Sequence, residues 1–178
     1  MNTIKTKYFA FVMILTALSI NVNCTKAQSL QQSLNSLRGI NKAGIIIEKV
    51  SQVLNENGLK EDEIRKDAVE KFDFAGIDVL PSSDIYGQPG APYLYINIGA
   101  VKSKENNLYS VNLSVEFRQD VNLTRNPKQI YNGATTWSVS NVGIFSEDKL
   151  KDIREFTKSL VDKFIKDYLK ANKMEETK

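Results

Sequence analysis

An alternation of apolar and polar residues between Leu108 and Leu123 limits the folds open to this chain more than any other feature. Every second residue from Tyr109 to Phe117 is apolar and the same phase returns after Gln119, so the apolar set is Tyr109, Val111, Leu113, Val115, Phe117, Val121 and Leu123. Successive side chains of an extended chain point to opposite faces, so this period places the apolar set on one side. The segment therefore predicts a long strand with one buried and one wet face, as in an antiparallel sheet.

Four shorter segments are expected to complete the sheet: residues 43–50, 77–80, 93–101 and 134–145. The first contains three consecutive isoleucines, which are typical of a strand buried on both faces. Residues 126–133 are expected to form the turn before the last strand. A bulge is expected in that strand between Asn141 and Gly143, where the alternation is interrupted.

Two helices are expected beside this sheet. Residues 61–74 have apolar side chains on one side, acidic residues in the first turn and Gly76 at the C-terminal cap. A second helix is expected to begin at a Ser146 cap and to keep one apolar face as far as Leu169. The pattern predicts an α+β fold with a mostly antiparallel sheet of four to five strands and two helices packed on one face.

The first 27 residues have the three parts of a secretory signal peptide. Lys5 and Lys7 precede an apolar core over residues 8–20, and small residues end the segment at Ala27. The apolar core is too short for a membrane-spanning helix, which needs about 20 residues. We expect cleavage after Ala27, export to the periplasm or the medium, and a single α+β domain over residues 28–178. Cys24 leaves lipid anchoring as an alternative, although the residues before it match a lipobox poorly.

Several function classes are excluded by the composition of residues 28–178. The three lysines of the leader account for the whole formal net charge of +3, so the remaining chain is balanced and lacks the basic excess of a nucleic-acid-binding domain. The chain contains no histidine, and its one cysteine is Cys24. We therefore expect no nucleic-acid partner, no cofactor, and no metal site of the histidine or cysteine type.

Six side chains are candidate binding residues, and no catalytic residue is assigned. Glu116 and Arg118 share the wet face of the long strand, and aromatic rings lie on the neighbouring segments; the full set is Glu116, Arg118, Trp137, Tyr93, Tyr95 and Tyr86. Tyr86 belongs to the loop over residues 81–92, which holds three of the four prolines. A solvated ion pair and ordinary core packing are the alternatives for these groups.

The segment 74–79 (FAGIDV), where a helix runs into a strand, resembles small exported bacterial α/β domains. These include the N-terminal domain of the Tol-system periplasmic propeller protein and related envelope assembly lipoproteins. Residues 92–97 (PYLYIN), 115–119 (VEFRQ) and 134–138 (ATTWS) are similar to uncharacterised exported bacterial proteins. The resemblance spans most of residues 37–171 and implies an envelope location and an interaction role.

The sequence thus favours an exported, non-enzymatic interaction module that binds another envelope protein. A carrier with a small-ligand pocket between helices and sheet is the first alternative. A hydrolase that uses two carboxylates is the second, with Asp73, Asp78, Asp84, Glu116 and Asp120 as candidates by residue type. The oligomeric state is left open.

Overall fold

The computed structural model describes residues 31–173, so the predicted signal peptide and Cys24 lie outside the described residues. A short helical stretch over residues 31–35 comes first. The elements that follow are, in order, β1 (Lys42–Ile47), α2 (Gln52–Glu56), α3 (Glu61–Ala75), β2 (Asp78–Leu80), the 3₁₀ helix η1 (Ile85–Gly87), β3 (Tyr93–Lys102), β4 (Leu108–Leu123), β5 (Asn126–Ser146), the 3₁₀ helix η2 (Glu147–Asp152) and α4 (Ile153–Lys173).

The five strands form one mixed sheet in the order β2-β1-β3-β4-β5. β1 runs parallel to both β2 and β3, whereas the pairs β3–β4 and β4–β5 are antiparallel. The α+β class and the five strands agree with the prediction, but the sheet is mixed and not antiparallel throughout. The physical reason is the connection through α2 and α3, because a helical crossover returns the chain to the end of the sheet at which β1 began and makes β1 and β2 parallel.

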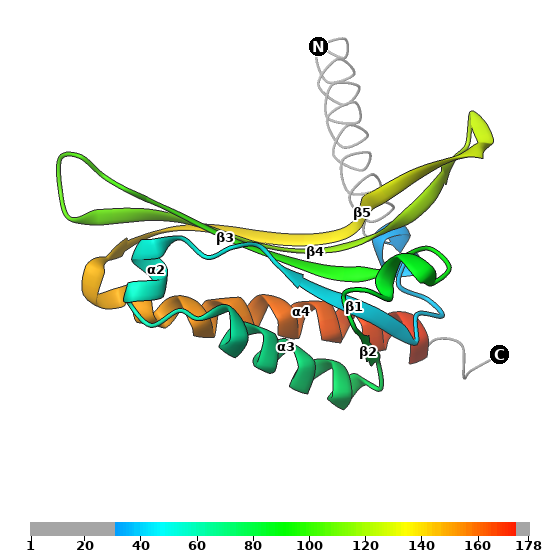
Figure 1. Cartoon of the computed structure of the whole chain (residues 1–178), viewed down its shortest axis with the longest axis horizontal. Helices are drawn as coiled ribbons and strands as arrows, with labels where there is room; N and C mark the ends of the chain where they lie inside the picture. The colour runs from blue at the N-terminus through cyan, green and yellow to red at the C-terminus, as the bar shows by residue number, and fades with distance from the viewer. Residues whose placement is uncertain (1–30, 174–178) are drawn as a thin grey trace, which may run out of the picture.

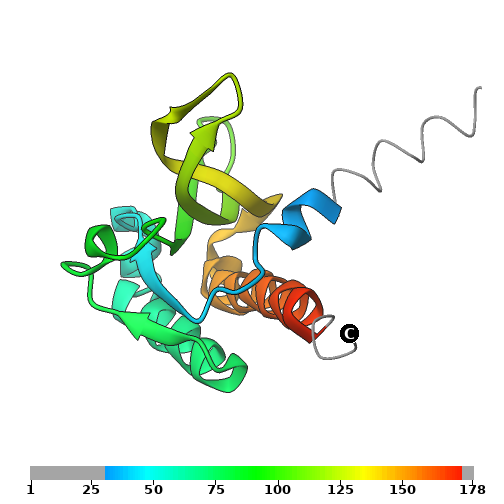
Figure 2. The same ribbon diagram turned by 90° about the vertical axis from the view of Figure 1, so that its right-hand side faces the viewer.

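The helices α3 and α4 pack against each other and against the sheet. Figure 1 shows both of them running beneath the strands, and Figure 2 shows them side by side when the molecule is turned by 90°. The ring of Phe164, fully buried on α4, stacks on Phe72 of α3 at 5.8 Å and on Phe117 of β4 at 5.4 Å between centroids. This aromatic cluster joins both helices to the long strand at the centre of the core.

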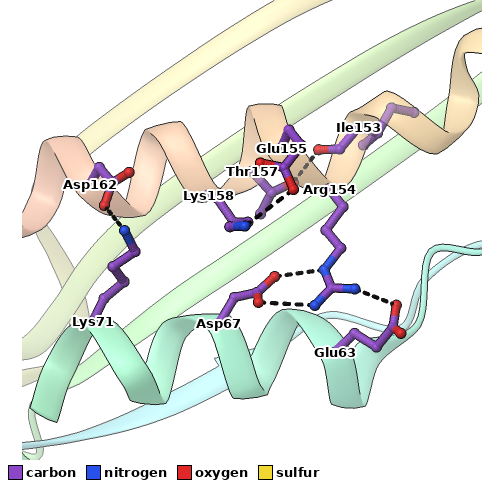
Figure 3. A network of polar contacts seen from close by, with 9 residues as sticks. All are labelled: Glu63, Asp67, Lys71, Ile153, Arg154, Glu155, Thr157, Lys158 and Asp162. Atoms are coloured by element: carbon purple, nitrogen blue, oxygen red, sulfur yellow. Dashed lines mark hydrogen bonds and ion pairs between the residues drawn. The ribbon is translucent and has the colours of Figure 1, made fainter.

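Polar contacts across the α3–α4 interface hold the two helices in register (Figure 3). Arg154 of α4 donates two hydrogen bonds to the carboxylate of Asp67 on α3, at 2.7 and 3.0 Å, and pairs with Glu63 at 3.0 Å. A second ion pair joins Lys71 to Asp162 at 2.5 Å. The first network is half-buried, whereas the second lies closer to solvent.

The alternation in β4 correctly predicts both the extent and the buried face of that strand. Its bounds are Leu108–Leu123, and the apolar residues from Tyr109 to Phe117 are buried while their neighbours are exposed or half-buried. The pairing of β4 with β3 is unbroken from Tyr93 opposite Arg118 to Lys102 opposite Tyr109. The buried row of β4 therefore lies over the helices along the whole length of β3.

β5 differs from the prediction at its beginning. The segment 126–133 is part of the strand and not a turn, so β4 and β5 extend together beyond the sheet as a hairpin arm (Figure 1). The bulges lie near Arg118, Val121 and Leu123 rather than between Asn141 and Gly143. In the arm the side chains of β5 are exposed on both faces, so alternation no longer reports burial there.

The last helix begins later than predicted. The 3₁₀ helix η2 follows Ser146, and α4 starts at Ile153. Ser146 makes no side-chain cap to the backbone, because its hydroxyl donates to the carboxylate of Asp148 at 2.6 Å. The apolar positions of this segment are nevertheless buried against the sheet, including Leu150, Ile153 and Phe164.

Candidate functional site

The sheet face opposite α3 and α4, which we call the outer face, carries the polar side chains of β3, β4 and β5. Strand register places Tyr95 opposite Glu116 and Glu116 opposite Ser138 on this face. Among the described residues no α-helix covers it, as the upper side of the sheet in Figure 1 shows. A wide, mainly polar surface is therefore open at the centre of the molecule.

A fixed group of side chains, which we call the Arg118 cluster, lies on the outer face near the beginning of β3. The guanidinium of Arg118 donates to Glu116 Oε2 at 2.8 Å and lies over the ring of Tyr95, 3.8 Å from its centroid. The hydroxyl of Thr135 donates to the same carboxylate oxygen at 2.8 Å, and the hydroxyl of Tyr95 donates to Glu48. The cluster thus joins β4, β3, β5 and the end of β1.

Electrostatics fix the protonation of this cluster at neutral pH. The hydrogen bond to Glu48 raises the pKa of the Tyr95 hydroxyl, and burial raises it further. Burial opposes the charge of Arg118, but the bonds to Glu116 outweigh it and raise the pKa of the guanidinium. Tyr95 is therefore neutral and Arg118 charged, and an arginine stacked on an aromatic ring presents a flat amphipathic surface.

The loop over residues 81–92 folds onto the outer face beside the Arg118 cluster. Its residue Ile85 is fully buried with Ala91 and Tyr93, and packs on Gly44 of β1. The backbone N–H of Asp120 donates to the carbonyl of Gly90 at 2.7 Å, which ties the loop to β4. The loop forms a wall at one end of the outer face.

The structure brings four of the six predicted binding residues together and places the other two elsewhere. Glu116, Arg118 and Tyr95 form the Arg118 cluster, and Tyr93, buried beneath the loop next to it, interacts with Arg118 and contributes to the raised pKa of its guanidinium. Tyr86 is 74% exposed on the loop. Trp137 lies in the core on the helix side of the sheet, so its ring is not accessible to a ligand on the outer face.

Trp137 is held in that position by specific contacts. Its indole Nε1 donates to Asp167 Oδ2 at 3.0 Å, and its ring meets Phe164 edge-on at 5.3 Å between centroids. Only 3% of the residue is exposed. Of the predicted alternatives, core packing therefore describes Trp137.

Sequence reasoning did not identify Glu48 or Thr135 as members of the cluster. Glu48 directly follows β1, and it meets Tyr95 only because β1 pairs with β3 in parallel. A sheet predicted to be mostly antiparallel gives no reason to place these residues side by side. Thr135 is placed opposite Arg118 by the bulge that leaves Thr136 unpaired, and no sequence signal marks that bulge.

Two further carboxylates proposed for hydrolysis have structural partners. Both oxygens of Asp120 accept hydrogen bonds, from the backbone N–H of Gly133 at 3.0 Å and from Asn132 at 2.7 Å. Glu116 Oε2 accepts hydrogen bonds from Arg118 and Thr135. Within residues 31–173 no three His, Cys, Asp or Glu side chains are grouped so that they could hold a metal ion.

An open hollow of about 300 Å³ lies between α3 and α4, lined by Glu70, Phe74 and Ile165 among others. The hollow beside Asp67 and Arg154 measures about 10 Å³, which is room for about one water molecule. Another open hollow of about 270 Å³ lies at the far end of the sheet, between Val101, Leu108 and Ile144.

None of the helices within residues 31–173 combines the length and the apolar character that a membrane-spanning helix needs.

No protein-family model matches the chain, and no curated protein matches its sequence. Solved structures that are similar include a minor lipoprotein from Acinetobacter baumannii, with 10% identity, a TM-score of 0.34, and 74% of this chain and 91% of that chain covered. The PelC dodecamer from Paraburkholderia phytofirmans has 15% identity and a TM-score of 0.39, with 74% and 88% covered. A putative lipoprotein from Caulobacter crescentus CB15 has 13% identity and a TM-score of 0.29, with 79% and 93% covered.

At TM-scores below 0.5, none of these structures assigns a fold family or a function to this chain. The predicted similarity to the Tol-system protein is not shown by them.

Proposed function

We propose that this chain is exported and works in the cell envelope as a non-enzymatic interaction module, formed by residues 28–178. The observation that carries the proposal is the open outer face with the Arg118 cluster on it. A charged guanidinium held flat over a tyrosine ring combines apolar contact area with directed donors, the combination found at protein-binding hot spots. The leader over residues 1–27 supports export.

The cluster is ready to bind before a partner arrives. Arg118 is held by Glu116 and Tyr95, so little side-chain freedom remains to be lost on binding. The exposed ring of Tyr86 on the adjacent loop adds a second contact point. The carrier alternative receives less support, because the hollow of about 300 Å³ between α3 and α4 is open to solvent and the one beside Asp67 has room for about one water molecule.

Site-specific photo-crosslinking in the native host tests the outer face as the binding surface. A photoreactive residue at Ser114 or Asn97 samples the outer face, and one at Lys66 samples the exposed side of α3. We expect one adduct of defined mass from the first two positions and none from Lys66. Adducts from Lys66 alone, or from no position, would reject the proposal.

A matched pair of arginine variants tests the role of the cluster. Arg118→Ala removes the guanidinium from the outer face, and Arg125→Ala removes one from the tip of the hairpin arm. We expect Arg118→Ala to reduce the adduct formed at Ser114 at least tenfold and Arg125→Ala to leave it unchanged. Equal loss in both variants would contradict a specific role for Arg118.

Export and anchoring need a separate measurement. The protein purified from the envelope of its host should begin at Gln28, as read by N-terminal sequencing. A mature form that begins at Cys24 and carries fatty acid would instead support the lipid-anchored alternative. Recovery of Met1 from the cytoplasm would reject export.

A further inference from the structure

Within residues 31–173, β5 is an edge strand that lacks the usual protection against pairing. Only β4 lies beside it in the five-stranded sheet. The stretch from Asn132 to Ser146 contains no proline and no charged residue over 15 positions. Natural sheets generally protect such an edge with lysine, proline, a bulge or a covering segment, because unpaired N–H and C=O groups recruit another strand.

The unprotected stretch has a defined beginning. The N-terminal segment reaches β5 at Thr136, where the hydroxyl of Ser36 donates to the Thr136 carbonyl at 3.3 Å. From Trp137 to Ser146 the pairing of β5 with β4 is regular, with no shift of register. Among the described residues, this leaves ten residues of β5, about 33 Å of extended strand, with no strand paired on the side that faces away from β4.

Exposed apolar side chains flank this edge on both faces of the sheet. Val142 and Ile144 project from the outer face and are 75% and 73% exposed. On the helix side, Phe156 of α4 is 46% exposed and packs edge-on against Phe145, with 5.6 Å between ring centroids. A strand added at this edge would lie between the two groups and remove both from water.

We propose that two copies of this chain pair through β5, antiparallel, about a two-fold axis near Val142. A second copy offers a strand of the same length without charge or proline. It also carries apolar groups at matching positions along the strand, on both faces of the sheet. Because both strands lack charge, no like charges meet across the axis. The product is one continuous sheet of ten strands with the helices of both copies on the same side.

This interface is distinct from the surface proposed for the envelope partner. The Arg118 cluster is centred on β3 and β4, and the two-fold axis lies at the edge of β5 that faces away from β4. Pairing through β5 therefore leaves the outer face of each copy open and places the two outer faces side by side. The dimer would present two identical binding surfaces on one side, which strengthens attachment to a partner with repeated sites.

Sedimentation velocity of the chain from Gln28, which includes every described residue, tests the dimer. We expect twice the mass of one chain at about 100 µM and dissociation on dilution. Val142→Lys places two lysines near the axis, and we expect it to raise the dissociation constant about 100-fold. Val101→Lys is the matched control, since Val101 is 71% exposed on the same face but two strands away from the edge, and we expect a change below about threefold.

Emission from the buried Trp137 verifies that each variant is folded. A purified chain that stays monomeric at about 100 µM would overturn the proposal, whatever the crosslinking of the outer face shows. A dimer that Val101→Lys dissociates and Val142→Lys does not would overturn it as well, because the interface would then lie elsewhere.

Discussion

Single side chains at the α3–α4 interface show how burial decides the contribution of an ion pair to stability. The carboxylate of Asp67 is largely buried and accepts two hydrogen bonds from Arg154, whereas the Lys71–Asp162 pair is half exposed. Breaking a buried, directed pair leaves a charge without compensation, but an exposed pair is screened by water. The two contacts, both drawn in Figure 3, should therefore differ in their effect on stability.

Asp67→Asn should lower the free energy of unfolding by about 2 kcal/mol at neutral pH. Asp162→Asn, the matched control on α4, should cost under about 1 kcal/mol. Urea unfolding followed by Trp137 emission measures both. Equal losses would show that the bidentate geometry of Arg154 has no special role.

The Asp67 pair should also make stability depend on pH. The hydrogen bonds from Arg154 lower the pKa of Asp67 below its ordinary value of 3.8 in the folded protein. The stabilising contribution is therefore complete above about pH 4 and is lost as the pH falls through the folded-state pKa. The difference between wild type and Asp67→Asn should shrink when unfolding is repeated below pH 3.8; a constant difference would argue against the linkage.

Gly44 is a second position where one atom decides local structure. A Cβ built on Gly44 would lie 2.2 Å from Cδ1 and 2.5 Å from Cγ1 of Ile85, which is fully buried. Gly44→Ala should therefore detach the loop over residues 81–92 from the outer face and lower stability by about 1–3 kcal/mol, as overpacking does.

A double-mutant cycle checks this reason. Ile85→Ala removes both clashing atoms, so Gly44→Ala should cost much less in the Ile85→Ala background than in wild type. Thermal unfolding of the four proteins gives the coupling. Strict additivity would mean that Gly44 is needed for some other reason than room for Ile85.

At the scale of elements, the sequence predicts best where burial on one face is continuous. β4 is predicted with its observed bounds, and α3 ends one residue from the predicted position, at Ala75 before the left-handed Gly76. The parallel pairing of β1 was not predicted, because three isoleucines indicate burial but carry no information on which strand lies beside them. The turn predicted at residues 126–133 was wrong, because the side chains of this arm are exposed on both faces and give no pattern of burial.

The candidate site follows the same division. The wet face of β4 predicts that Glu116 and Arg118 lie together, and the structure has them in one ion pair. The link to Glu48 depends on the parallel β1–β3 pairing, which no local pattern reveals. Trp137 illustrates the opposite difficulty, because an aromatic residue suits a core and a binding surface equally well in sequence.

The hairpin arm should contribute little to global stability. Ile130 and Tyr131 on the arm are 58% and 59% exposed, so the arm buries little apolar surface. Because Asn122 pairs with Ile130, residues 123–129 can be replaced by Asn-Gly, which favours a two-residue turn between those partners. The shortened chain should unfold within about 1 kcal/mol of wild type in urea. A loss comparable to a buried core substitution would show that the arm packs against the rest of the molecule.

At the scale of the whole molecule, the first and last described segments are tied together. Asn172 near the end of α4 accepts a hydrogen bond from the backbone N–H of Gly39 at 2.9 Å and donates to the carbonyl of Leu37 at 3.1 Å. The hydroxyl of Tyr168 donates to the carbonyl of Ile40 at 2.7 Å. Leu37 is fully buried, so the segment before β1 belongs to the core and closes the end of the helix layer.

Asn172→Ala should therefore loosen the N-terminal segment without unfolding the sheet. It removes a donor and an acceptor that satisfy two backbone groups, and we expect a loss of about 1–2 kcal/mol. Trypsin cleavage after the exposed Arg38 should accelerate, because residues 31–40 would open locally while Trp137 stays buried. Asn141→Ala, at an exposed position of β5, is the control and should leave the cleavage rate unchanged. Unchanged cleavage in Asn172→Ala would mean that burial of Leu37 alone holds the segment, and Leu37→Ala would then be the variant that releases it.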